Sequence, residues 1–414
     1  MDVLFRVRIQ GKECVERTTA ANHLERNQKL MFYVGIDIAK TKHDLACMDE
    51  TGETVITNFR FANSYQGFHQ LKIKLEQLSP ITQDVQIALE STGHYNYNIV
   101  AFLREIGYNV FAYNPFIIKQ FAKSQSLRKT KTDTKYTLLI ARKLRSDVTP
   151  DYYQTDKVMD ELKELTRYQN RLIQSRSKCK NLYIRLLDII FPEINSYVSN
   201  LHSHFVYELL TKYPSAQKIA RARVSSLLKI KRLTADKAHQ IQEIAKQTIG
   251  NTSTVLSLEL QLIESIKHYD KQINQVQEEI NLLMIELNSP ITSIPGIGSR
   301  LGAIILAEMK TIHNFRNPNQ LQAFAGLDPA IYQSGQMDNT GHMVKRGSSY
   351  LRYALIQAAK LISIYSPHFK AYLKLKISQG KHYNVAVTLV AKKLIRVIYH
   401  LLKTNQTFDE AKLR

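Results

Sequence analysis

The sequence predicts three parts: an α/β domain, a long helical middle, and a mainly α C-terminal domain. Three observations lead to this prediction. Short apolar runs alternate with amphipathic helical patterns up to about residue 150. Apolar residues then recur at spacings of three, four and seven as far as residue 288. After Pro290 a Gly-rich turn, a polar stretch and further apolar helices follow.

The composition indicates a partner of opposite charge. The 414 residues carry a net charge of +21 at pH 7. Such an excess is typical of proteins that bind nucleic acid, because each neutralised phosphate releases counterions; a merely soluble basic protein is the alternative. The three cysteines form neither a CxxC pair nor a metal-ligand spacing, and no apolar run reaches the length of a membrane span. We therefore expect a cytoplasmic protein with no membrane partner.

The domain boundaries are predicted from changes in pattern. Residues 1–30 are polar and without a clear period, so we expect them to be disordered or to precede a true start at Met31. The remaining parts are an α/β domain at 31–150, a helical region at 151–288, a C-terminal domain at 289–405 and a tail at 406–414.

The α/β domain begins with two apolar runs that read as a hairpin. Further strands and helices follow in a fixed order. The expected strands are 32–38, 43–48, 54–61, 85–89 and 109–113, and the expected helices are 65–78, 95–106 and one opened by Pro115. Three strands followed by alternating helix and strand are the order of a ribonuclease H-like sheet.

Three acids occupy informative positions in this order. Asp37 ends the first strand and Glu90 ends the fourth, so both would lie on neighbouring central strands. Asp133 stands in the first turn of a later helix, expected within residues 126–145, where capping is the ordinary role of an acid. Together, three carboxylates on two strands and a helix suit Mg²⁺-dependent phosphoryl transfer, because carboxylate oxygens are the ligands that Mg²⁺ prefers.

Basic residues surround the third acid. The stretch SLRKTKTDTKYTLLIARKLR has an apolar helical face and a cluster of cations before it. These cations are expected to contact phosphates, although a solvated basic face is the usual meaning of such a run. They are Arg128, Lys129, Lys131 and Lys135.

The middle of the chain is helical. One helix repeats an apolar residue every seven positions from Leu165 to Leu186 and is stopped by Pro192. In a second helix, from Leu262 to Leu287, apolar residues follow one another at alternating spacings of four and three positions without a break. This pattern predicts a coiled-coil seam. This seam can pack within the chain as a helical hairpin or between protomers. Residues 195–250 form a less regular, basic helical stretch without an assigned role.

The C-terminal domain opens with SIPGIGSRLGAIILAEM, a Gly-rich turn before an apolar helix. This is the pattern of a helix-hairpin-helix element, whose turn amides at Gly296 and Gly298 could hold a backbone phosphate; a plain helix turn is the alternative. The stretch from Phe324 is rich in Gly, Ser and Asn and is expected to be loop. Helices are expected again at 350–364 and 384–403.

Three motifs, GIDIAK, ALESTG and NPFIIKQFAKSQSLRKTKTD, resemble the RuvC-like DEDD domain of the insertion-sequence transposases of the IS one-ten (IS110) family. The resemblance implies that Asp37, Glu90 and Asp133 bind the metals. The FAGL-P segment and the following Y-x-S-G stretch resemble the C-terminal transposase domain of that family, which implies that Ser334 is the nucleophile. Lys345, Arg346 and Arg352 are expected phosphate contacts or solvated surface cations.

The family's fourth acid is replaced in this chain. It belongs three residues after the third, where this sequence has Tyr136. A phenol is neutral near pH 7 and a poor Mg²⁺ ligand. Asp147 cannot replace it from the same helix, because eleven residues at about 1.5 Å each place it roughly 16 Å from position 136. Either three carboxylates suffice, or this copy is impaired.

The resemblance implies a DNA transposase that attacks a DNA phosphate through a serine with metal assistance. It also implies a guiding non-coding RNA and a homo-oligomer, dimer or tetramer, of two catalytic domains joined by a helical coil. Two other functions stay open: a RuvC-like Holliday-junction nuclease that uses water, and an inactive nucleic-acid-binding relative. A sugar-kinase or actin-like ATPase also begins with a G-I-D strand, but the later half of this chain lacks the second Asp-Gly phosphate loop.

Overall fold

The structure, a computed structural model, describes residues 31–90, 95–113, 115–125, 133–147, 157–251, 253–334, 337–343 and 345–413. For residue 116 and for residues 329–334 and 337–342, the structure describes the backbone but not the side chains. The chain divides into two units, unit 1 at Met1–Gln154 and unit 2 at Thr155–Arg414. The expectations for residues 1–30 and for Arg128, Lys129 and Lys131 fall outside the described residues.

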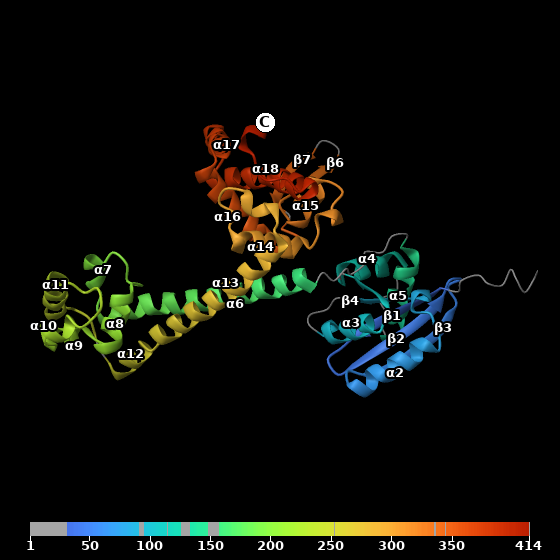
Figure 1. Cartoon of the computed structure of the whole chain (residues 1–414), viewed down its shortest axis with the longest axis horizontal. Coiled ribbons are helices and arrows are strands. Elements are labelled where there is room, and N and C mark those ends of the chain that lie inside the picture. The colour runs from blue at the N-terminus through green and yellow to red at the C-terminus, as the bar shows by residue number, and fades with distance from the viewer. Residues whose placement is uncertain are drawn as a thin grey trace, which may run out of the picture. The chain divides into compact units, whose positions relative to one another are not determined.

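Unit 1 is built on a five-stranded mixed sheet (Figure 1). Its strands are β1 (Phe32–Ile38), β2 (Lys42–Asp49), β3 (Thr54–Ala62), β4 (Val85–Glu90) and β5 (Asn109–Tyr113). Their order is β3-β2-β1-β4-β5. β2 runs antiparallel to β1 and β3, whereas β1, β4 and β5 are parallel. This topology is compatible with the predicted ribonuclease H-like domain.

Side chains alternate between the two faces of β1, as a strand requires. Val34 and Ile36 are buried in a core shared with α2 (Tyr65–Glu76) and α3 (Asn96–Glu105). The other face packs against α5 (Asp133–Ser146), which also contacts α4 (Pro115–Gln125). The acidic positions of β1 and β4 therefore lie on the face that α5 covers.

Gly35 allows α5 to approach the sheet closely. A Cβ atom at this position would lie 2.1 Å from the carbonyl oxygen of Thr137 and 2.7 Å from the amide nitrogen of Ala141. Both are backbone atoms of α5 and cannot swing aside. The glycine of the GIDIAK motif thus sets the distance between the strand and the helix that carry two of the predicted acids.

Unit 2 is organised around two long helices, α6 (Lys157–Ile190) and α13 (Leu262–Leu287), which pack on each other (Figure 1). The predicted seam residues Ile266, Val276 and Ile280 are buried within the unit. The seam therefore packs within the chain; the coiled-coil geometry itself stays a prediction.

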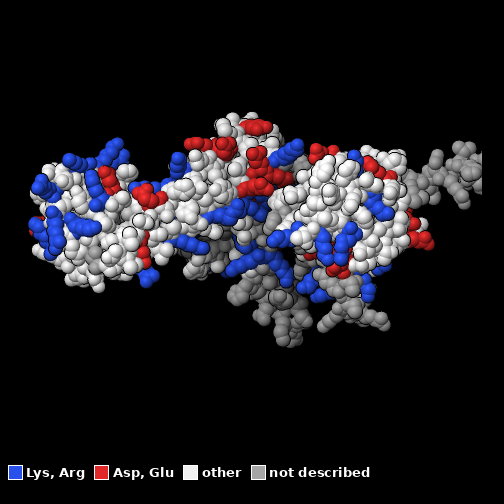
Figure 2. Space-filling model, turned by 90° about the horizontal axis from the view of Figure 1, so that it is seen from below, with Lys and Arg blue, Asp and Glu red and all other residues white. Residues whose placement is uncertain are grey.

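The stretch between these helices forms a small helical bundle with its own core. Its helices are α7 (Ile194–Tyr197), α8 (His204–Lys212), α9 (Ala216–Arg221), α10 (Val224–Leu227), α11 (Ala235–Lys246) and α12 (Thr254–Glu259). Lys and Arg side chains are prominent on the bundle in Figure 2, where it lies at the left. Exposed members of this group are Lys218, Arg221, Arg223, Lys229, Lys231 and Arg232. The unassigned basic stretch is thus a folded, positively charged subdomain.

The C-terminal helices pack on the first half of α6 and the second half of α13 around a separate core. They are α14 (Ser299–Met309), α15 (Pro318–Phe324), α16 (Ser349–Tyr365), α17 (Pro367–Ser378) and α18 (Tyr383–Thr404). Among the described residues, we find no helix that combines the length and the apolar character needed to cross a membrane.

The prediction of a loop after Phe324 was wrong in part. Two antiparallel strands, β6 (Pro329–Ser334) and β7 (Met337–Met343), form a hairpin there. The Gly, Ser and Asn content led to the loop prediction. These strands, however, are paired through backbone hydrogen bonds, which do not require apolar residues at alternate positions. A two-stranded ribbon of this kind depends on the packing at its ends, which composition does not reveal.

Candidate active site

A row of polar residues crosses the face of the sheet that α5 covers. Asp37 on β1 pairs with Asp44 on β2, which pairs with Arg60 on β3. On the other side, Glu90 follows Leu89, the partner of Ile36, so it lies level with Asp37. The strand register thus places the predicted Asp37 and Glu90 side by side. It also places Asp44 and Arg60 in the same row, although no sequence motif pointed to them.

Tyr136 of α5 reaches down to this row. Its phenol donates a hydrogen bond to Oε2 of Glu90, which is only 7% exposed. Burial, the hydrogen bond to Glu90 and the charges of Glu90 and Asp37 together raise the pKa of Tyr136 well above its ordinary value. The residue at the family's fourth acidic position is therefore a neutral hydrogen-bond donor to the acid row.

Asp133 lies at the start of α5 beside Arg60. One guanidinium nitrogen of Arg60 lies 3.5 Å from Oδ2 of Asp133. The same guanidinium donates to both carboxylate oxygens of Asp44, at 2.8 and 3.3 Å. Asp44 is 5% exposed, and this hydrogen-bonded partner raises the pKa of Arg60. Arg60 thus links the acid row to the predicted acid of the helix.

The donor chemistry of these residues fits a divalent cation. Buried carboxylates need a positive charge or hydrogen-bond donors, and here Arg60 and Tyr136 supply them. Asp37, Glu90 and Asp133 come from β1, β4 and α5, and their oxygens are of the kind that hard divalent ions prefer. Over the ranges that the structure describes, however, no three His, Cys, Asp or Glu residues gather closely enough to form a metal site.

Asp147 has other partners. Its Oδ2 accepts a 2.6 Å hydrogen bond from the hydroxyl of Tyr113, and its Oδ1 pairs closely with Lys143. Both interactions keep this carboxylate at the last turn of α5. Of the predicted basic cluster, Lys135 is described and is exposed on α5.

The glycines of the predicted phosphate-binding turn differ in their surroundings. Gly296 has a φ of +87°, and a Cβ there would lie 2.7 Å from the Cβ of Leu361 on α16. Gly298 is the N-cap of α14, is exposed, and has open space where a Cβ would stand. Packing against α16 thus explains why a glycine stands at position 296. That either glycine contacts a phosphate stays a prediction.

Ser334 is the last residue of β6, and its backbone pairs with Met337 at the tip of the ladder. Its side chain lies outside the described part of the chain. The base of the hairpin is tied together by Arg352, whose Nη1 donates to the carbonyl oxygens of Ala325 and Lys345, at 3.1 and 3.3 Å. Lys345 and Arg346 are exposed at the same base. Arg352 therefore has a structural task, and its contact with phosphate stays a prediction.

Asp44 and Arg60 are the members of the site that motif reading missed. The signal that could have found Asp44 is its place in the predicted first hairpin, opposite Asp37. Arg60 could be found only by predicting how the second and third strands pair. That pairing contains a register shift, which a sequence pattern does not reveal. Neither residue belongs to the quoted motifs.

Two stretches of the chain match known families. Residues 34–192 match a DEDD-type domain described as a transposase, a type of domain that suggests the use of a divalent metal. Residues 288–374 match a domain described as the transposase IS116/IS110/IS902 family. The first match covers the acid row and α6, and the second covers the hairpin with Ser334.

Several relatives align over most of the chain. A pilin gene-inverting protein of Moraxella bovis is 23% identical, over 91% of this chain and 98% of the relative. An insertion element IS110 uncharacterized 43.6 kDa protein of Streptomyces coelicolor is also 23% identical, over 92% of this chain and 96% of the relative. A transposase for insertion sequence element IS1111A of Coxiella burnetii is 28% identical over 40% of this chain and 47% of the relative. By these matches the chain belongs to the IS110/IS116 family of transposases, the DNA recombinases of insertion sequences.

Proposed function

We propose that this transposase joins DNA strands through a covalent serine intermediate formed with the help of Mg²⁺. The hydroxyl oxygen of Ser334 attacks a DNA phosphorus and loses its proton, a phosphoserine ester forms, and the bond to the sugar oxygen breaks, so that this oxygen leaves as a hydroxyl after taking up a proton. Strand exchange then proceeds through a branched DNA intermediate. The reaction is a phosphoryl transfer in which the number of phosphoester bonds is conserved.

The observation that carries the proposal is the acid row beneath α5. Asp37 and Glu90 lie level on neighbouring strands, and the close approach at Gly35 holds α5 with Asp133 above the same face. Several carboxylates gathered on one face of a sheet are typical of a functional site, because like charges held close together are costly unless cations meet them.

Asp37, Glu90 and Asp133 would hold the metal. When bound, a divalent ion would stabilise negative charge on the attacking and leaving oxygens. Tyr136 would stay protonated and orient Glu90 through its hydrogen bond. Arg60 would stay paired with Asp44 beside the site and offset part of the negative charge of the row.

Nucleic acids and further copies of the chain complete the proposal. The positive charge of +21 supports binding of the donor and target DNA and of a guide-type RNA, whose base pairing would select the sequence. An assembly of two or four copies would bring Ser334 of one copy to the acids of another.

The two other functions differ in what they require. A Holliday-junction nuclease would use the same acids with water as nucleophile, so Ser334 would be dispensable. An inactive relative would bind nucleic acid without cutting it, and Tyr136 in place of an acid is the observation that favours this reading.

The first test incubates the purified chain with RNA transcribed from its element, labelled donor DNA and Mg²⁺, and resolves the products on a denaturing gel. We expect a protein-linked DNA species that disappears with Ser334→Ala and persists with Ser378→Ala, an exposed serine at the end of α17. Cleavage that Ser334→Ala retains would overturn the serine mechanism in favour of water.

A second variant separates an impaired copy from a functional three-acid site. If the natural chain binds DNA but forms no adduct, Tyr136→Asp supplies the missing acid and should restore Mg²⁺-dependent cutting. Failure of both chains to cut, with binding intact, would leave the inactive relative as the function.

A further inference from the structure

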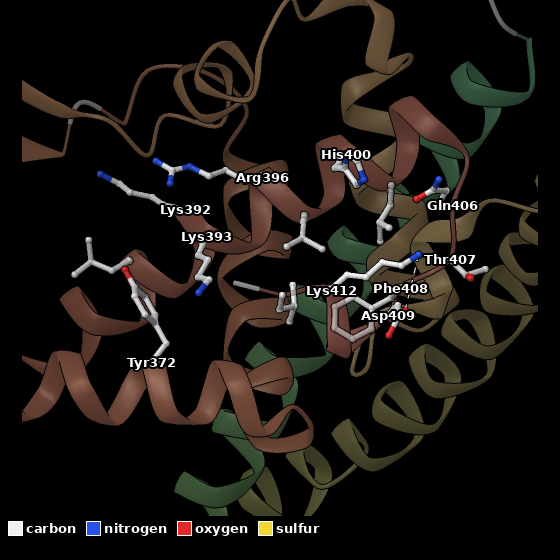
Figure 3. A pocket seen from close by; sticks show the side chains of 14 residues that line it. Tyr372, Lys392, Lys393, Arg396, His400, Gln406, Thr407, Phe408, Asp409 and Lys412 are labelled. Atoms are coloured by element: carbon white, nitrogen blue, oxygen red, sulfur yellow. Dashed lines mark ion pairs between the residues drawn. The ribbon is translucent and has the colours of Figure 1, made fainter.

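Unit 2 contains a hollow of about 580 Å³ between α17, α18 and the C-terminal tail. Figure 3 shows its side chains: Tyr372 comes from α17, Lys392, Lys393, Arg396 and His400 from α18, and Phe408, Asp409 and Lys412 from the tail. The catalytic proposal uses none of these residues.

The tail is fixed in place, so the hollow is a built feature. The amide of Phe408 donates to Oγ of Ser293 at 2.8 Å. Two residues later, Oε1 of Glu410 accepts from the hydroxyl of Ser366 at 2.7 Å and from the amide of His368 at 3.0 Å. These hydrogen bonds anchor the far wall of the hollow at three points.

The rim of the hollow is positively charged. Lys392, Arg396 and Lys412 line it together with His400. Asp409 is the one acid among the described lining residues, and it is already engaged: its Oδ1 accepts from the amide of Ala411 at 3.0 Å and its Oδ2 lies 3.9 Å from Lys412. The rim therefore carries an excess of positive charge that suits a phosphate.

The wall and floor are largely apolar. Val397 and Leu401 of α18 line the hollow together with Leu389, Phe408 and Leu413. A cavity of this size with largely apolar walls is typical of sites for small organic groups. A phosphate alone would leave most of this space empty, whereas a nucleotide has an anionic end for the rim and a flat apolar base for the interior.

Lys393 lies on the inner side of the rim. Its Nζ lies 2.6 Å from Nε2 of His368 and 5.0 Å from the centre of the Tyr372 ring. Burial and the neighbouring charge of Arg396 lower the pKa of Lys393. A phosphate beside Arg396 would relieve this repulsion, so anion binding and full protonation of Lys393 favour each other.

We propose that this hollow binds an unpaired nucleotide of a nucleic-acid strand, with the base against Val397, Leu401 and Phe408 and its phosphate at Lys392 and Arg396. A base in a helix is stacked and paired, so only a single-stranded or extruded nucleotide can enter. The inference rests on the proposed function in one respect, since the chain must bind nucleic acid. It adds a site for strand capture made of residues other than those of the acid row and Ser334.

The test uses the full chain and short oligonucleotides that contain one 2-aminopurine, whose fluorescence rises when it leaves the stack. Single-stranded DNA, single-stranded RNA and duplex DNA are compared, with inorganic phosphate and a mononucleotide as competitors. We expect binding and a rise in fluorescence with single strands, and the DNA and RNA arms identify which strand the site prefers.

Two variants test the two halves of the site. Lys392→Ala/Arg396→Ala should weaken single-strand binding and reduce the slope of log K against log salt by about 1.4, or about 0.7 for each lost phosphate contact. Thr407→Trp, at an exposed position of the tail, should fill the hollow and abolish the fluorescence rise while keeping the rim charge. Lys374→Ala/Lys381→Ala removes two exposed cations outside the hollow and serves as the matched control.

The outcomes separate this inference from the proposed function. If single strands bind but both pocket variants behave like the control, the pocket is not a nucleotide site, while the serine reaction can still be present. Equal affinity for a free mononucleotide, or for inorganic phosphate, would show a small-molecule site and overturn strand capture. A chain that binds no nucleic acid at all would overturn both proposals.

Discussion

At the scale of single residues, Arg60 has the most consequential neighbours. It pairs with Asp44, which is nearly inaccessible, and also lies beside Asp133, whose side chain is 62% exposed. The Asp44 carboxylate is thus balanced by the protein itself, while Asp133 is shared between Arg60 and solvent. A cation arriving at the acid row would meet a site whose negative charge Arg60 has partly offset.

We predict that Arg60→Gln tightens binding of Mn²⁺, used as a probe for Mg²⁺, by roughly tenfold, because one positive charge beside the acids is removed. Isothermal titration of the full chain measures this. Arg142→Gln, an exposed change on α5 with the same effect on net charge, should leave the affinity nearly unchanged. Weaker Mn²⁺ binding in Arg60→Gln would mean that Arg60 orients the acids more than it opposes a cation.

At the scale of elements, the packing of α5 on β1 decides where the acids stand. The contact depends on Gly35, since any side chain there would meet the α5 backbone. Because Asp133 and Tyr136 both belong to α5, a shift of this helix moves them relative to Asp37 and Glu90. The glycine is therefore a condition for the geometry of the site.

Accordingly, Gly35→Ala should lower the free energy of unfolding of unit 1 by about 3 kcal/mol, at the upper end of overpacking costs. It should also weaken Mn²⁺ binding, because α5 must move outward. Thermal unfolding and titration of the full chain report the two effects. Gly298→Ala, where a Cβ meets open space, is the control and should change the midpoint little. An unshifted midpoint for Gly35→Ala would show that α5 is not held against β1 as described.

At the scale of the whole molecule, the helices of unit 2 are joined through Glu308. This residue of α14 is 4% exposed and accepts from Arg167 of α6 at 2.8 and 3.1 Å, and from the hydroxyl of Ser348 at 2.7 Å. Ser348 caps α16 directly after the hairpin segment. One carboxylate therefore connects the long helix, the C-terminal core and the base of the hairpin that carries Ser334.

Glu308 also makes the stability of unit 2 depend on pH. Burial acts to raise its pKa, but hydrogen bonds from Arg167 and Ser348 and the nearby charge of Lys163 outweigh it and bring the pKa below its usual 4.5. A carboxyl whose pKa is lowered by folding contributes its full stability above pH 4.5 and loses it as the pH falls through the folded-state pKa.

We therefore expect Glu308→Gln to destabilise unit 2 at pH 7 by about 2 kcal/mol, less than for a fully buried pair because Arg167 is partly exposed. The difference from the natural chain should shrink as the pH falls below 4.5 and through the folded-state pKa, because the natural side chain is then uncharged as well. Urea unfolding at each pH measures it. Glu264→Gln, which breaks an exposed pair with Lys267 on α13, should cost under about 1 kcal/mol. A constant difference across this pH range would contradict the role assigned to the Glu308 charge.

Much of unit 1 could be predicted from local pattern. Its strands are short apolar runs, and Pro115 opens a helix where expected, so each expected element has a counterpart in the structure. The hairpin at β6 and β7 was missed because its residues carry no apolar period. The long helices were predicted, but the seam on α13 alone could not say that its partner is α6 of the same chain.

The sequence by itself determined the order of the elements apart from the β6–β7 hairpin, because that order follows from local periodicity. The motifs that resemble the transposase family singled out Asp37, Glu90, Asp133 and Ser334. Tertiary structure alone decided that Arg60 joins Asp44 to Asp133, that Tyr136 donates to Glu90, and that the tail closes a hollow on α18. These contacts join residues far apart in the chain. They depend on strand register and helix approach, which are set by packing of the whole domain and leave no local trace in the sequence.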